Sequence, residues 1–114
     1  MVNKGAPHMK KDQRYVGIFN DLHGGMTDAG KIIRDAWALG LLPESETCEG
    51  WLAPGIEDLW AKVSTEWEQY GFSVAKLPDD LRERYLRIQD EAMQRARAAG
   101  WNPAVDLYDD EDDL

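Results

Sequence analysis

Apolar residues recur at helical spacing along three stretches of the chain, and each stretch ends in the same two-residue signal. At positions 40–41, 71–72 and 100–101, a glycine is followed directly by leucine, phenylalanine or tryptophan. Glycine readily adopts the left-handed backbone conformation that ends many helices, and an apolar residue after it can pack back onto the last turn. The pattern therefore predicts three helices that stop at these glycines.

The three predicted helices span residues 27–39, 55–70 and 78–99. Their apolar positions repeat every three or four residues, which places them on one face of each helix. The first face holds Ala29, Ile32, Ile33, Ala36 and Trp37; the second holds Ile56, Leu59, Trp60, Val63, Trp67 and Tyr70; the third holds Leu81, Tyr85, Ile88, Ala92, Ala96 and Ala99. Thr27 or Asp28 is expected to cap the first helix.

The third helix also carries three acid-before-base pairs at a spacing of four residues. The pairs are Asp80 with Arg84, Glu83 with Arg87, and Glu91 with Arg95. Such pairs stabilise exposed helix surfaces by roughly 0.3 kcal/mol each. They predict a solvated face opposite the apolar one.

Residues 12–23 are ambiguous. Tyr15, Ile18, Phe19 and Leu22 have helical spacing, but the run from Arg14 to Phe19 is also compatible with a strand. A strand needs a partner, and the only other candidate strands are short, so a fourth helix is favoured.

These elements predict an all-α fold, a compact bundle of three to four helices. The alternative is an α+β fold with a short N-terminal strand. Residues 12–105 are expected to form the single helical domain, and residues 1–11 a disordered N-terminus that, from its His8-Met9 junction, is partly a cloning scar. Residues 106–114 are expected to be a disordered acidic tail.

The charge is uneven and restricts the possible partners. The chain of 114 residues has a net charge of −9. Two blocks carry the excess of acid, residues 44–70 and 106–114. Nucleic-acid binding normally relies on clustered Lys and Arg. Because this chain has an excess of acid instead, nucleic acid is not an expected partner. No apolar run approaches the ~18 residues of a membrane span, so a membrane is not an expected partner either. A domain this small also excludes a large multi-lobed enzyme.

Cys48 is the single cysteine, so neither an intramolecular disulfide nor a cysteine metal site is expected, and a cytoplasmic location fits. Glu46 and Glu49 lie beside it, and nearby negative charge disfavours the thiolate that a nucleophile needs.

Two further motifs were weighed for chemistry. Residues 25–31 match the start of a phosphate-binding loop, but Ile32 replaces the hydroxyl residue that binds magnesium, and Asp28 would repel phosphate. Asp21 and His23 lack a second histidine to complete a metal site. No catalytic residue, metal or cofactor is therefore predicted, and the chain is not expected to be an enzyme.

The candidate partner-binding residues lie in two places. Trp51 and Leu52 follow an acidic loop that contains Glu46 and Glu49, and aromatic residues of this kind often anchor protein interfaces. On the third helix, Leu86 and Met93 form a second apolar ridge with Arg82 and Arg97 beside it, as in many interaction surfaces. In both places the alternative is packing within the bundle itself.

The sequence thus favours a small acidic interaction or regulatory module without catalytic activity, with another protein, or a second copy of the chain, as partner. Two alternatives remain. Surface carboxylates could mimic phosphate spacing and inhibit a DNA-binding protein, or the domain could bind a small ligand.

Overall fold

The computed structural model describes residues 13–101, so the expectations for residues 1–11 and for the acidic tail at 106–114 lie outside it. In the described range the chain forms three α-helices: α1 (Asp28–Leu39), α2 (Ala53–Glu68) and α3 (Asp79–Ala98). Three short 3₁₀ turns accompany them: η1 (Ile18–Asn20), η2 (Leu22–Gly24) and η3 (Val74–Lys76). The all-α prediction is confirmed, with three helices. No helix of this range is long and apolar enough to span a membrane.

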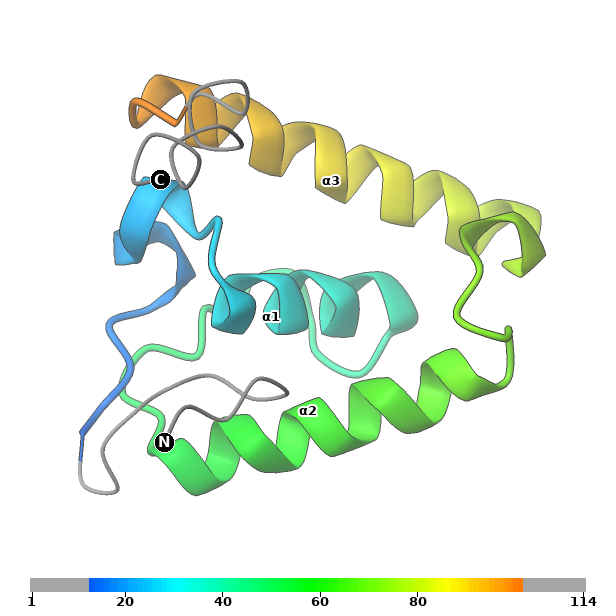
Figure 1. Cartoon of the computed structure of the whole chain (residues 1–114), viewed down its shortest axis with the longest axis horizontal. Helices are drawn as coiled ribbons and strands as arrows, with labels where there is room; N and C mark the ends of the chain where they lie inside the picture. The colour runs from blue at the N-terminus through cyan, green and yellow to red at the C-terminus, as the bar shows by residue number, and fades with distance from the viewer. Residues whose placement is uncertain (1–12, 102–114) are drawn as a thin grey trace, which may run out of the picture.

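Helix α1 is the centre of the structure. It lies between α2 and α3 and contacts both of them, as Figure 1 shows. Every residue from 32 to 38 is buried in consequence, including the charged pair Arg34 and Asp35. Thr27 caps the helix by accepting a hydrogen bond from the amide of Gly30, at 3.0 Å. Burial around most of its circumference makes α1 the helix that organises the core.

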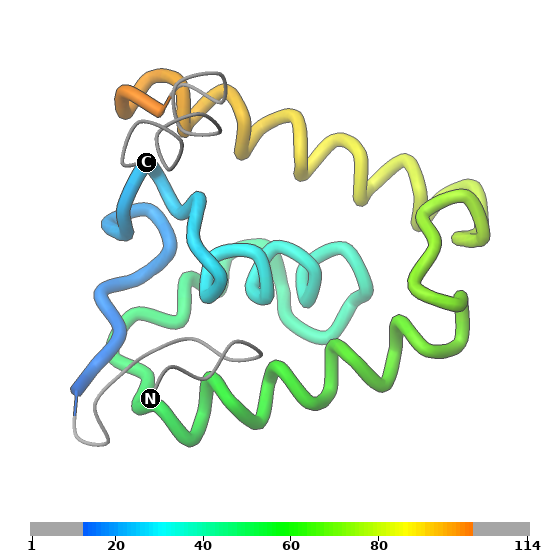
Figure 2. Tube along the Cα trace, in the orientation of Figure 1, coloured from blue at the N-terminus to red at the C-terminus, as the bar shows by residue number. Residues whose placement is uncertain are grey.

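The glycine signal ends all three helices in the same way. In each case the residue after the glycine donates its amide to the carbonyl five positions earlier: Leu41 to Ala36, Phe72 to Trp67 and Trp101 to Ala96, at 2.8, 3.1 and 2.8 Å. This hydrogen bond satisfies a carbonyl that the helix end would leave free. After α2 the chain turns through η3 and runs back as α3, a path that Figure 2 traces.

The N-terminal segment is neither the predicted fourth helix nor the alternative strand. Among the described residues its only strand-like pairing is one isolated bridge between Arg14 and Leu52. Gly17 has a φ of 93°, which interrupts any helix there. The amides of Tyr15 and Ile18 instead donate to loop carbonyls, those of Trp51 and Thr47, at 2.8 and 3.1 Å. The apolar spacing reflects the burial of Tyr15 and Ile18, and the described part of this segment has helical backbone only in the short 3₁₀ elements η1 and η2.

The arginines of α3 also differ from the prediction. Nε of Arg84 donates to the carbonyl oxygen of Ala38 at 3.0 Å, and so caps the end of α1. Arg87 pairs with Glu44 in the acidic loop at 2.8 Å, and also with Glu91 on its own helix. The guanidinium of Arg95 lies 4.9 Å from the ring centroid of Phe19. Because α3 packs on α1, these side chains reach neighbouring elements instead of forming the predicted pairs.

Candidate functional site

A pocket opens where α1, α2 and α3 meet the connection that follows α2. Its volume is about 400 Å³, within the range of small-molecule sites. Most of its lining is aromatic or aliphatic, and the three polar side chains are Lys31, Asp35 and Ser64. The full lining comprises Lys31, Ile32, Asp35, Trp60, Val63, Ser64, Trp67, Phe72, Val74 and Tyr85. The pocket therefore combines apolar walls with a few polar groups.

Asp35 supplies the buried charge of this pocket. Its side chain is 3% exposed. Oδ2 accepts one hydrogen bond from Nζ of Lys31 at 2.9 Å and another from Nε1 of Trp67 at 3.2 Å. Oδ1 is buried and has no hydrogen-bond partner. A buried carboxylate oxygen without a donor is costly, so the charge of Asp35 depends on the two hydrogen bonds to Oδ2.

The two cations nearest to Asp35 in the sequence behave differently. Lys31 reaches Oδ2 from the rim, and its side chain is 59% exposed. Arg34 is buried, but its guanidinium donates to the carbonyl oxygen of Gly25 at 2.7 Å and to the sulfur of Met26. Burial lowers the pKa of Arg34, an effect that Asp35 partly opposes. The buried charge in the pocket lining is thus the negative charge of Asp35, and the opposite charge is that of Lys31, on a flexible and exposed side chain.

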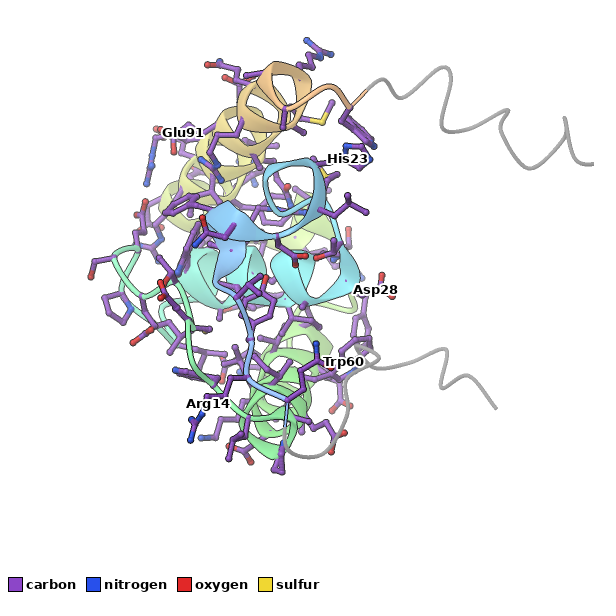
Figure 3. The ribbon with its side chains drawn as sticks, turned by 90° about the vertical axis from the view of Figure 1, so that its left-hand side faces the viewer. Arg14, His23, Asp28, Trp60 and Glu91 are labelled. Carbon is purple, nitrogen blue, oxygen red and sulfur yellow. The ribbon has the colours of Figure 1, made fainter. Side chains whose placement is uncertain are left out.

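Aromatic rings form the walls. Trp67 and Tyr85 meet edge to face, with ring centroids 5.7 Å apart. Trp60 lies one helical turn before Val63 and two before Trp67, and all three line the pocket. Figure 3 shows Trp60 on the same side of the molecule as Asp28 at the start of α1, and Glu91 on the opposite side. The faces of such rings carry partial negative charge and attract cations.

Phe72 belongs to the lining and is held in an unusual backbone conformation. Its φ is 57°, a left-handed value that bulky side chains rarely adopt. The residue is 64% exposed, so burial provides little compensation for this strain. Strained residues of this kind concentrate at binding sites. Phe72 is therefore placed by the turn after α2 at the pocket, where a ligand could cover its ring.

The predicted partner-binding residues of the acidic loop are largely tied to the domain. Trp51 is half-buried and packs against the core. A carboxylate oxygen of Glu46 accepts a hydrogen bond from the amide of Cys48 at 2.9 Å. Glu49 and Leu52 are exposed. Two of the four residues predicted here are therefore exposed, and Leu52 is only 39% exposed.

On α3, Leu86 is 53% exposed and Met93 is half-buried. Leu52 precedes α2 and Leu86 lies on α3, and these helices are on opposite sides of α1 (Figure 1). The acidic loop nevertheless reaches α3, because its Glu44 pairs with Arg87, the residue after Leu86, at 2.8 Å.

Asp21 and Cys48 belong to the hydrogen bonding and packing of the fold. Asp21 accepts hydrogen bonds from the hydroxyls of Tyr15 and Thr27, at 2.7 and 2.6 Å. Burial, with a contribution from Glu46, raises the pKa of the Cys48 thiol to about 12. Within residues 13–101, no three His, Cys, Asp or Glu side chains form a group that could hold a metal ion.

Sequence reasoning considered Lys31 only as the last residue of the incomplete phosphate-binding loop at 25–31, and it did not single out Asp35. A helix turned to the core on one face only would have left Asp35 in solvent, but α1 is enclosed on two sides. One signal was available: Lys31 and Asp35 are four residues apart and flank the apolar positions of a short helix.

Comparison of the chain with protein-family models, with curated proteins and with solved structures gives no match in any of the three. The geometry of the chain itself therefore carries the functional argument.

Proposed function

We propose that the protein binds a small organic molecule in the pocket between its three helices. The observation that carries this proposal is the buried carboxylate of Asp35, which lies in the mainly apolar lining of a pocket of about 400 Å³. Ligand sites typically combine apolar walls with a small number of oriented polar groups. The strained and exposed Phe72 supports the same function, because a bound molecule would bury its ring.

The test is thermal unfolding with and without neutral aromatic probes, indole and 2-phenylethanol. A ligand at ten times its Kd stabilises the folded state by about 1.4 kcal/mol. For a domain of this size, this corresponds to a rise in Tm of several degrees. No rise at millimolar concentrations of either probe, or of the charged probes described below, would contradict the proposal.

Two variants of adjacent residues on α2 locate the binding. Ser64 lines the pocket, whereas Thr65 does not line it and is exposed. Ser64→Trp is expected to fill the pocket and abolish the rise in Tm. Thr65→Trp adds the same bulk outside and should leave the rise unchanged. Loss in both variants, or in neither, would place binding elsewhere.

A second proposal retains the protein-interaction function, with a second copy of the chain as partner. The exposed Leu86 favours it, because α3 has basic and acidic side chains beside this leucine, and two antiparallel copies could pair them. Sedimentation velocity should then show a dimer, and Leu86→Glu a monomer. A wild-type protein that stays monomeric at high concentration contradicts this proposal. Nucleic-acid mimicry stays a prediction, since one acidic block lies outside residues 13–101.

A further inference from the structure

The charges of the pocket are arranged so that the buried one is negative and the movable one is positive. Asp35 is 3% exposed, and its partner Lys31 is 59% exposed. An exposed lysine loses little when it leaves an ion pair for water. A buried carboxylate that loses its partner is strongly destabilised. A ligand can therefore replace Lys31 at low cost, provided that it brings its own positive charge.

We infer that the ligand is a protonated organic amine with an apolar, preferably aromatic, body, and that its ammonium group takes the place of Lys31 on Asp35. This inference rests on the proposed binding function. An ammonium group has several N–H donors, so one of them can take over the hydrogen bond that Nζ of Lys31 donates to Oδ2. The rings of Trp60, Trp67 and Tyr85 suit the positive head and the apolar body alike.

An anionic ligand on Lys31 is disfavoured by the same geometry. Its carboxylate would enter a pocket whose desolvated charge is already negative, and the aromatic faces would repel it. Lys31 would pair with such an anion in the solvent-exposed rim of the pocket, where water weakens an ion pair.

The experiment compares three probes of nearly equal size by isothermal titration calorimetry at pH 7.5. They are 2-phenylethylamine, neutral 2-phenylethanol and anionic phenylacetate. Both the amine and the alcohol can donate to the carboxylate, but only the amine adds an opposite charge and a cation–π contact with the rings, so it should bind roughly tenfold or more tightly than the alcohol. Phenylacetate should bind most weakly. Equal affinity for amine and alcohol, or tighter binding of phenylacetate, overturns the inference and leaves the proposed function standing; binding of none overturns both.

Two variants test the role of each charge. Asp35→Asn should reduce the preference for the amine over the alcohol to within about twofold, because the carboxylate is lost. Lys31→Met should strengthen amine binding several-fold, since the internal competitor is gone. Lys62→Met is the matched control, because Lys62 also pairs with an acid four residues away, Asp58 at 3.0 Å, outside the pocket. An amine preference that survives in Asp35→Asn contradicts the inference, as does unchanged binding in Lys31→Met. If Asp35→Asn or Lys31→Met fails to fold, the comparison of the three probes on the wild-type protein still decides.

Discussion

The indole Nε1 of Trp67 donates a hydrogen bond to Oδ2 of Asp35 at 3.2 Å, across 32 positions of the sequence. This bond joins α2 to α1 in a contact that is otherwise mainly apolar. It also fixes the orientation of the carboxylate, so that one residue contributes both to the packing of the helices and to the chemistry of the pocket.

Asp35→Ala is expected to lower the free energy of unfolding by about 1–3 kcal/mol, because the buried donor of Trp67 loses its acceptor. Asp35→Asn keeps an oxygen at the same place and should cost less than Asp35→Ala, although it also removes the negative charge beside the buried Arg34. Urea denaturation measures both. Equal losses in the two variants would show that the hydrogen bond of Trp67 contributes little.

Phe72→Asn should leave Tm unchanged or raise it. Asparagine tolerates a left-handed backbone much better than phenylalanine, and little buried surface is lost at an exposed site. The same variant should weaken binding of 2-phenylethylamine, because a ring of the pocket is removed. A lower Tm with unchanged affinity would mean that Phe72 stabilises the turn and not a ligand.

Arg84→Met should lower the free energy of unfolding by about 1–2 kcal/mol, because the carbonyl of Ala38 at the end of α1 loses a charged donor. Arg87→Met is the comparison on the same helix. Its partner Glu44 is on the surface, where water screens an ion pair and leaves it little net effect on stability. Chemical denaturation of the two variants should rank them in this order, and the reverse order would contradict the capping role of Arg84.

The protein should lose stability as the pH rises above about 9. Burial raises the pKa of Cys48 to about 12 from an ordinary value of 9.0, and burial with the Asp21 hydrogen bond also raises the pKa of Tyr15. Both groups ionise first in the unfolded state, so unfolding is favoured increasingly between the two pKa values. Below pH 9 their contribution is fully present.

Circular dichroism against pH measures this loss of stability. In Cys48→Ala the decline should begin about one pH unit higher, at the ordinary pKa of tyrosine, which is about 10. Cys48 should also resist a thiol reagent in the native protein and react after unfolding. A pH profile that is identical in both proteins would contradict the contribution of the thiol.

The helices could be predicted because local signals define them. The residues after Gly40, Gly71 and Gly100 make the backbone bonds that the glycine pattern predicts, and Thr27 caps α1 as expected. The segment at 12–23 was predicted wrongly, since its amides pair with a loop about 30 residues away. Periodicity shows which side chains are apolar but does not show which distant carbonyls are free to accept.

The pocket could not be predicted for a related reason. Lys31 and Asp35 read as an ordinary surface pair, and only the enclosure of α1 by both neighbours buries Asp35. Sequence spacing alone favours partners for Arg84 and Arg87 on their own helix. The fold instead brings Arg84 to Ala38 and Arg87 to Glu44. Tertiary neighbours therefore decide which charged residues face the interior.

A ¹⁵N NMR titration with 2-phenylethylamine tests the central claim most directly, because each tryptophan contributes one indole N–H signal. The signals of Trp67 and Trp60 should shift together and saturate, since both residues line the pocket and Trp67 donates to Asp35. Trp37 does not line the pocket, and its Nε1 donates to the carbonyl of Glu46 at 2.9 Å. The signal of Trp37 should therefore stay in place. Unmoved Trp60 and Trp67 signals at millimolar amine would contradict the assignment of this pocket as the binding site.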